Sequence, residues 1–203
     1  YVDSKTWDAA AMLRFRDYPD VARWKAIEKG MPGGLCAEGL ALGAPVQTDS
    51  ADLAWKNPGA GEAPAESVFL VIPYKYLGLV DEYKAYAEGY VVPQLEGWLQ
   101  KGVLASYRVY LNRFPTGDRW GSLLVLEYKD IESFGRRNAV RAEVRAILRE
   151  DPKWKAFSDV KKTIRQEAEP VIAEALRPAA APAPKAPAQA PEQIGRASCR
   201  ERG

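Results

Sequence analysis

Residues 120–137 read WGSLLVLEYKDIESFGRR, and residues 7–24 read WDAAAMLRFRDYPDVARW. At an offset of 113 positions the two stretches share four identical residues, Asp17 with Asp130 among them. Each stretch is a strand-like run that ends at this aspartate, and a helical pattern follows. An aspartate side chain can accept hydrogen bonds from the free N–H groups of a first helical turn, so it suits that junction. The matching order favours an internal duplication of one structural unit.

The second copy predicts a complete set of elements. They are a strand over 68–76, a helix over 79–101, strands over 103–114 and 119–129, and a helix over 130–148. Pro93 lacks the N–H that its helical turn needs, which predicts a kink near Gly89. The turn at 115–118 offers a glycine for a positive φ. Residues 163–169 fit a last short strand or a continuing helix about equally well.

The order β-α-β-β-α-β is the ferredoxin-like pattern, an α+β fold in which an antiparallel sheet carries its helices on one face. The first copy shows only the later part, with a strand over 8–16, a helix over 19–29 and a strand over 46–55. Its first β-α-β would occupy about 50 residues before Tyr1. We therefore expect a tandem duplication with a truncated first copy, forming a pseudo-dimeric α/β barrel.

The same argument divides the chain into five parts. They are the end of a first unit (1–57), a Gly/Ala/Pro linker (58–66), a complete second unit (67–177), a disordered Ala/Pro tail (178–192) and a terminal segment (193–203). The terminal segment QIGRASCRERG matches a translated sequencing adapter, so we exclude it from the fold. Without it, basic and acidic residues balance and Cys36 is the one cysteine left.

Composition excludes several kinds of chemistry. The 203 residues contain no histidine, which rules out Ser-His-Asp and Cys-His nucleophile systems, His-ligated haem and the common zinc and iron sites in this stretch of chain. The formal net charge of +2 argues against nucleic acid as a partner. No apolar run reaches the length of a membrane span. We expect no metal and no cofactor.

Four motifs carry a resemblance to a known group. VFLVIPY (68–74), GVLASY (102–107), YLNRFP (110–115) and LLVLEYKD (123–130) are similar to uncharacterised bacterial proteins, several of them apparently exported. The strand order resembles the dimeric α/β-barrel superfamily, which includes the antibiotic-biosynthesis-monooxygenase-like domains. The resemblance covers roughly residues 7–176 and implies two sheets that face each other around a cavity. Because the motifs are structural, it implies a fold and little about activity.

The predicted hairpin also predicts a site. If Phe114 pairs with Arg119, one sheet face carries Tyr107, Val109, Leu111, Ser122, Leu124 and Leu126, an apolar set that should meet the helices. The other face carries Ser106, Arg108, Tyr110 and Asn112 with Gly121, Leu123, Val125 and Glu127. Polar groups in an apolar frame are typical of ligand pockets. The ligand-binding candidates are therefore Arg108, Tyr110, Asn112, Glu127 and Ser106; no catalytic residue is assigned.

Each candidate also has a plainer interpretation. Arg108 lies diagonally near Glu127, so it either binds an anionic or carbonyl group or forms an ion pair that closes a sheet interface, and the ion pair is favoured. By the repeat, Arg14 is equivalent to Glu127 and is a second candidate partner for it. Oxygenases of the resembled superfamily hold an acidic aromatic substrate with Asn, Trp, Tyr and Arg. Tyr110 and Trp120 belong to those residue types, but aromatic packing explains them better.

Other features read as structure. Tyr83, Tyr86 and Tyr90 fall on one helix face, and we expect them in the core. The glycines of Gly30–Gly34 predict the end of a helix. Residues 149–155 predict a solvated charged turn.

Three functions remain, in this order. The first is a small-molecule-binding or assembly module that self-associates through the free sheet face. The second is a cofactor-free oxygenase acting on a small aromatic substrate. The third is a structural exported protein that uses its tail as a spacer. Whether the chain is an enzyme is left open. Its localisation is exported if a signal peptide precedes Tyr1 and cytoplasmic otherwise.

Overall fold

A computed structural model describes residues 7–57, 64–117 and 119–176. One antiparallel sheet of six strands contains β1 (Ala51–Lys56), β2 (Val68–Tyr76), β3 (Leu104–Asn112), β4 (Ser122–Tyr128), β5 (Arg165–Glu167) and β6 (Val171–Glu174). The helices are α1 (Tyr18–Gly30), the short η1 (Pro32–Gly34), α2 (Ala37–Leu42), α3 (Val80–Tyr86), the π-helical turn η2 (Ala87–Val91), α4 (Val92–Gln100), α5 (Ile131–Leu148) and α6 (Pro152–Ile164).

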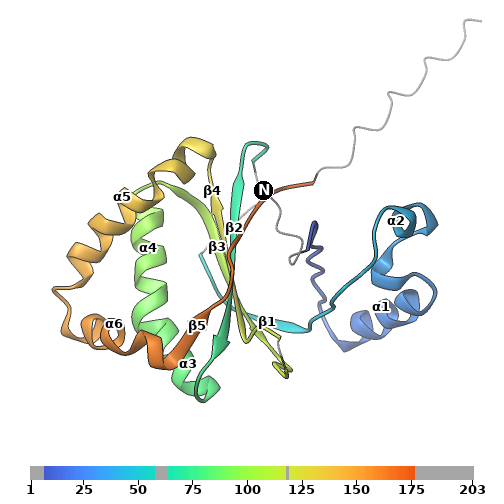
Figure 1. Ribbon diagram of the computed structural model, residues 1–203, viewed down its shortest axis with the longest axis horizontal. Helices are drawn as coiled ribbons and strands as arrows, with labels where there is room; N and C mark the ends of the chain where they lie inside the picture. Colours follow the sequence, from blue (N-terminus) through green and yellow to red (C-terminus); the bar gives the residue numbers. More distant parts are fainter. Residues whose placement is uncertain (1–6, 58–63, 118, 177–203) are drawn as a thin grey trace, which may run out of the picture.

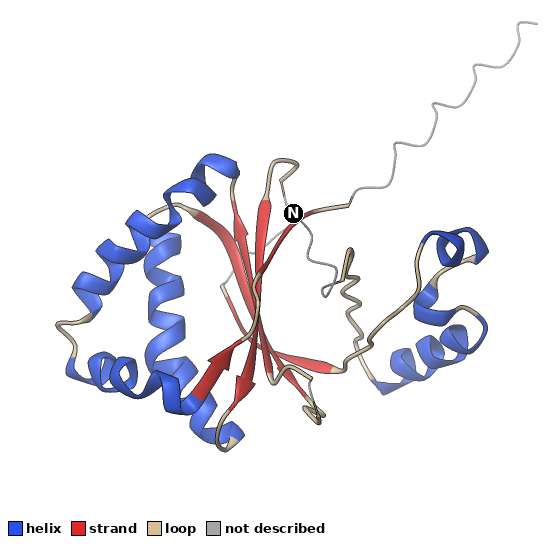
Figure 2. Cartoon of the chain, in the orientation of Figure 1, coloured by secondary structure: helices blue, strands red, loops and turns tan. Residues whose placement is uncertain are grey.

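The strand order identifies the fold. The strands run β1-β3-β4-β2-β5, with β6 also on β2, so β2 and β4 are central and the chain from β2 onward follows β-α-β-β-α-β. This is the predicted ferredoxin-like α+β fold. Helices α3 to α6 lie on one side of the sheet, whereas α1 and α2 lie on the other side (Figure 1; helices blue and strands red in Figure 2). Strand β1 extends the sheet at its β3 edge, and the duplication stays a prediction.

The helix expected over 79–101 changes geometry in its middle. A π-helical turn, η2, separates α3 from α4 and lies directly before Pro93. The ring of proline supplies no N–H, so the backbone widens in the turn that precedes it. A side-chain carbon at Gly89 would overlap the ring of Phe157, so the close approach of α6 requires a glycine there. The helix begins one residue later than expected, since Leu79 is its N-cap, and the Leu79 side chain is exposed.

The core lies between the sheet and helices α3 to α6 and is rich in tyrosine. As predicted, Tyr83, Tyr86 and Tyr90 are fully buried. The Tyr86 and Tyr90 rings stack at 5.1 Å between centroids, and Tyr90 stacks in turn on Trp154 at 4.7 Å. Offset aromatic stacking of this kind adds to the free energy gained from burying the rings. The aromatic column therefore ties the η2 turn to α6.

The prediction of a solvated turn over 149–155 is confirmed for residues 149–151, which are exposed and form a turn, and was wrong for residues 152–155. Helix α6 begins inside that segment, at Pro152, and Asp151 caps it by accepting a hydrogen bond from the N–H of Lys153. Trp154 is 1% exposed, and its indole Nε1 donates to the Tyr90 carbonyl at 3.1 Å. An aspartate before a proline at the first helical position is a start signal, which the surrounding charges obscured. The continuing helix ends at Ile164, and a strand follows.

The expected helix caps and stops are present. Asp17 accepts from the N–H of Asp20 at 2.9 Å, and Asp130 accepts from the N–H of Ser133 at 2.6 Å. These caps begin α1 and α5 at the two positions that the repeat aligns. After α1 the chain turns through Gly33 and Gly34, whose φ angles are 61° and 74°. Glycine reaches such positive values without steric cost, which confirms the helix stop.

The strand expected over 8–16 was wrong, because residues 8–16 form no strand. A strand needs a neighbour to take up its N–H and C=O groups, and none pairs with this stretch in the described part. The strand expected over 46–55 is confined to β1. The linker, apart from residues 64–66, and the predicted tail and terminal segment lie outside the described residues.

Candidate functional site

The predicted pairing of β3 with β4 is confirmed. Tyr107 lies opposite Leu126, and Arg108 lies opposite Val125, as the assumed turn requires. The face that carries Tyr107, Val109 and Leu126 is buried against the helices. The polar candidates therefore lie on the opposite face of the sheet, with Tyr110 and Arg108 partly exposed.

Glu127 is the centre of that second face. Its carboxylate is buried, and it accepts hydrogen bonds from Ser106 Oγ at 2.5 Å and from Ser67 Oγ at 3.2 Å. Arg108 Nη1 lies 3.7 Å from Glu127 Oε2. Three of the predicted residues thus meet, and we call them, with Ser67, the Glu127 cluster. The hydroxyl donors satisfy a carboxylate that would otherwise be costly to bury.

Ser67 was missed by the sequence interpretation. It lies two residues before Phe69, which pairs with Glu127 across β2 and β4. Residues two apart on a strand share a face, so Ser67 is a diagonal neighbour of Glu127. The sequence places Ser67 beside Glu127 only when β2 is paired with β4. The hairpin prediction covers β3 and β4 alone, so it could not include Ser67.

Arg108 is positioned by Glu127, but its N–H donors are not all engaged. Its side chain is 25% exposed, and within the described residues it forms an ion pair with Glu127 at a distance too long for a hydrogen bond. A guanidinium has five N–H donors in a planar fork that matches a carboxylate. The arginine therefore presents unused donors on a sheet face that is otherwise largely apolar.

Tyr110 adjoins this arginine. Burial raises the pKa of its phenol, and the positive charges of Arg108 and Arg14 oppose that rise. Arg14 therefore acts on Tyr110, while Glu127 forms its ion pair with Arg108. The proposed pairing of Arg14 with Glu127 is not observed. The phenol keeps its proton at neutral pH and offers a neutral donor beside a cation.

Asn112 is not part of the cluster. Its side-chain Nδ2 donates to the Trp120 carbonyl at 3.0 Å, and its Oδ1 accepts from the N–H of Phe114 at 2.9 Å. Both ends of the amide therefore hold the β3–β4 hairpin together. Trp120 is half-buried at the same hairpin.

Apolar side chains frame the cluster on the same face. They come from the two central strands and are partly or fully buried: Phe69, Val71, Pro73, Leu123 and Val125. A flat apolar frame around one cation, one phenol and buried hydroxyls suits a small planar molecule with an acidic or carbonyl group.

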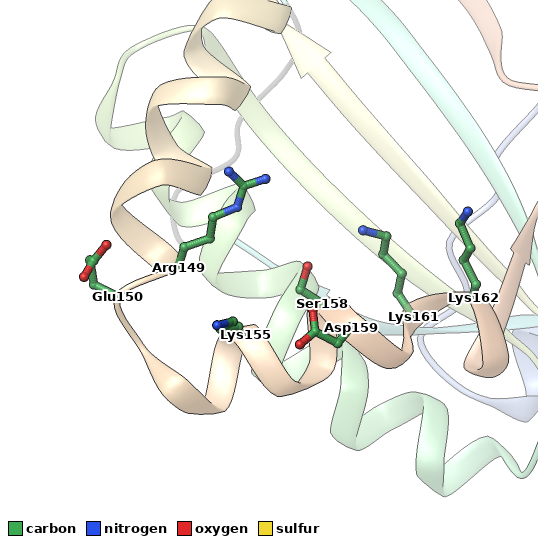
Figure 3. Close-up of a pocket in the computed structure, with 7 residues that line it drawn as sticks. All are labelled: Arg149, Glu150, Lys155, Ser158, Asp159, Lys161 and Lys162. Carbon is green, nitrogen blue, oxygen red and sulfur yellow. The ribbon is translucent and has the colours of Figure 1, made fainter.

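Two surface hollows lie elsewhere, on the helical layer. One of about 660 Å³ lies along α6 and the end of α5 (Figure 3), and one of about 290 Å³ lies between α4 and α5. Neither is lined by Arg108, Tyr110 or Glu127. Within the described residues there is no group of three side chains suited to a metal ion and no helix able to cross a membrane.

Comparisons with known proteins found only solved structures of low similarity. No family model matches the chain, and no curated protein matches it. A solved structure described as a mutant of SnoaB, a cofactor-independent oxygenase from Streptomyces nogalater, has 10% identity and a TM-score of 0.35 over 56% of this chain and 97% of its own. A dimeric protein of unknown function and ferredoxin-like fold from Bacteroides fragilis has 18% identity and a TM-score of 0.35, covering 54% and 96%.

A putative monooxygenase from Fusobacterium nucleatum has 16% identity and a TM-score of 0.41 over 79% of this chain and 64% of its own. Similarity at this level says nothing of chemistry, and the strand order of the chain itself defines the class. That class is the ferredoxin-like α+β fold, the type found in dimeric α/β barrels, as the sequence motifs had predicted.

Proposed function

We propose that this chain is a small-molecule-binding module whose site lies on the sheet face opposite α3 to α6. The observation that supports this most is Arg108, whose donors are left unused beside the buried carboxylate of Glu127. An arginine that served only to neutralise Glu127 would approach within hydrogen-bond distance, because that geometry gives the larger stabilisation.

The ligand class follows from the side chains around that arginine. Arg108 offers a planar pair of donors for a carboxylate, Tyr110 offers a phenol, and Phe69 and Leu123 offer apolar surface. We expect a small aromatic acid to fit these groups. Its ring would lie on the apolar frame while its carboxylate meets the guanidinium.

The same face supports an assembly role. Phe69, Pro73 and Leu123 stay partly exposed there, and a second sheet laid on this face would bury them. That second sheet would come from another copy of the chain. Enclosure would also strengthen the charge interactions of Arg108, since it removes water from around them. Binding and self-association are therefore two uses of one surface.

The oxygenase alternative has weaker support. It needs an amide free to hold the substrate, and both ends of the Asn112 amide are engaged in the hairpin. We therefore place binding ahead of catalysis.

The proposal is tested with two probes that differ in charge. Salicylate carries a carboxylate, and salicylamide keeps the ring and hydroxyl without that charge. Titration of the full chain, followed by NMR, should show saturable binding of salicylate in preference to salicylamide. Arg108→Gln should weaken salicylate binding by about tenfold or more, because a charge-assisted hydrogen bond is lost.

The matched control is Arg136→Gln, which removes the same charge from the exposed surface of α5. This variant should bind salicylate as the parent does. Absence of saturable binding by the parent, or equal losses in the two variants, would refute a site at Arg108. Oxygen consumption that depends on a phenolic substrate would instead favour the oxygenase.

A further inference from the structure

The hollow along α6 has a charge that the fold does not explain. It occupies about 660 Å³ and is lined by Arg149, Glu150, Lys155, Ser158, Asp159, Lys161 and Lys162. Four of these side chains are cations and two are acids, although the whole chain is close to neutral. Arg149 and Lys161 extend toward each other from α5 and α6, while Glu150 lies at the far end (Figure 3). Lys155 lies on the side of Glu150 and Lys162 lies beyond Lys161 on the other side, so positive charge borders the hollow at several points (Figure 3).

These cations are not used in ion pairs. Among residues 7–57, 64–117 and 119–176, the ion pairs include none of Arg149, Lys155, Lys161 and Lys162. Lys161 lies 6.0 Å from the centroid of the Tyr90 ring, a long contact for a cation with an aromatic face. The four side chains thus repel one another with no carboxylate paired to them.

Helix stability accounts for only part of this arrangement. Lys161 and Lys162 lie in the last turn of α6, where a positive charge interacts favourably with the helix dipole. Lys155 lies at the opposite end, together with Lys153, and no acid accompanies them in the first turn. A positive charge near a helix N-terminus is unfavourable. The helix dipole therefore gives no reason for Lys155 to lie where it lines the hollow.

We propose that this hollow binds a small anion that carries several phosphate groups. Arg149 follows the end of α5, and the three lysines come from both ends of α6, so the cations offer separate contacts to more than one phosphate group. Lysine acts as a point charge toward phosphate, and the Ser158 hydroxyl adds a neutral donor. The volume lies within the range of about 300–1,000 Å³ that is typical of small-ligand sites.

The rest of the lining narrows the ligand class. The lining contains no aromatic ring, so it offers no surface on which a nucleobase could stack. Asp159 adjoins Ser158 and repels an anion from that side, which leaves the side of Arg149 and Lys161 (Figure 3). Recognition then depends on charge and spacing, which favours a compact polyphosphate over a nucleotide.

The experiment uses inorganic tripolyphosphate as the probe and the full chain as the protein. Phosphorus NMR and calorimetry at physiological salt should show one saturable site, and orthophosphate should bind at least about tenfold more weakly because it meets fewer cations. The double variant Arg149→Gln/Lys161→Gln should lose about tenfold in affinity, because it removes the two cations on the side left open to the anion. Lys153→Gln removes a lysine of the same helix that does not line the hollow, and should bind as the parent does.

Two results would overturn the proposal. One is the absence of saturable binding by the parent, or an equal loss in Lys153→Gln and the double variant. The other is binding to vesicles that contain a phosphoinositide without binding to tripolyphosphate, which would make the surface a lipid headgroup site. Thermal unfolding of each variant checks that the charge changes leave the fold intact.

Discussion

Glu127 shows how one buried charge organises a sheet face. Its carboxylate holds two serine hydroxyls, from Ser67 and Ser106, and pairs with the partly exposed Arg108. Removal of a carboxylate from such a set leaves buried donors without an acceptor and a cation without its counter-charge. That loss costs more than the favourable energy of any one contact, because the desolvation penalty of each orphaned group remains.

We predict that Glu127→Ala lowers the free energy of unfolding by about 2–4 kcal/mol. The estimate lies below that of a fully buried pair, since Arg108 retains some contact with water. Urea denaturation of the two proteins measures the difference. Glu88→Gln, at an exposed glutamate of η2, should change the midpoint little. A Glu127→Ala protein as stable as its parent would show that the cluster contributes nothing to folding.

At the residue scale the sequence predicted the near contacts and missed the distant one. Arg108 and Glu127 lie on two strands joined by a short hairpin. The assumed pairing of Phe114 with Arg119 sets the register of that hairpin, so it predicts that the two residues are diagonal neighbours. Ser67 is 60 positions from Glu127 in the chain, and only the β2–β4 pairing brings it close. The role of Asn112 was also beyond reach, because an amide that closes a hairpin and an amide that faces a ligand have the same sequence pattern.

At the element scale, caps were easier to predict than pairing. Asp17 and Asp130 cap α1 and α5 because the signal lies within four residues of the helix start. The expected strand over 8–16 failed because a strand depends on a partner that local sequence does not specify. Helix α6 escaped notice for another reason: its buried anchor, Trp154, stands among charged residues whose pattern is that of a solvated loop.

Two helical glycines give a matched test of helix packing. Gly97 of α4 faces Val144 of α5 so closely that an added side-chain carbon would lie 2.5 Å from Val144 Cγ1. Valine has few rotamers in a helix, so it cannot move aside easily. Gly97→Ala should therefore destabilise the protein by about 1–3 kcal/mol, as measured by thermal or urea unfolding.

Gly135 of α5 is the control, because a carbon added there meets nothing within 4 Å. Gly135→Ala should stabilise the protein by about 0.5–1 kcal/mol, since alanine restricts the unfolded chain and favours the helix. Effects of the same sign in the two variants would contradict the close approach of α4 to α5.

At the scale of the whole molecule, the tyrosine core predicts sensitivity to alkali. Burial raises the pKa of Tyr128 to about 12 and raises those of Tyr74 and Tyr86 in the same direction. Unfolded tyrosines release their protons near pH 10, while the folded ones keep theirs. The stabilisation is therefore complete below about pH 10 and falls as the pH rises toward the folded pKa.

We expect the free energy of unfolding to decline above about pH 10, by up to about 1.4 kcal/mol per pH unit for each buried tyrosine. Urea denaturation at a series of pH values measures the slope. Tyr128→Phe should make it shallower, whereas Tyr18→Phe, at a tyrosine that is 71% exposed, should leave it unchanged. Equal slopes in the parent and Tyr128→Phe would show that Tyr128 ionises freely in the folded protein.

The attachment of residues 18–56 is the other property of the whole molecule. Helices α1 and α2 contain no buried residue, and β1 joins the sheet only at the edge of β3. Two arginines beside the β3–β4 hairpin strengthen this edge. Arg113 donates to both carboxylate oxygens of Asp52 at 2.6–3.0 Å and to the Tyr18 hydroxyl at 2.9 Å.

Arg119 completes the attachment by donating to the Thr48 carbonyl at 2.8 Å and pairing with Asp49. Besides Trp55, which packs partly buried against the core, these contacts and the β1–β3 ladder hold the segment. The double variant Arg113→Gln/Arg119→Gln should therefore speed hydrogen exchange of the β1 amides by about tenfold or more, because each exposed pair contributes up to about 1 kcal/mol. The amides of β2 and β4 should exchange at unchanged rates, since their strands are covered by α3 to α6. Faster exchange across all strands would show instead that β1 and the central sheet unfold as one cooperative unit.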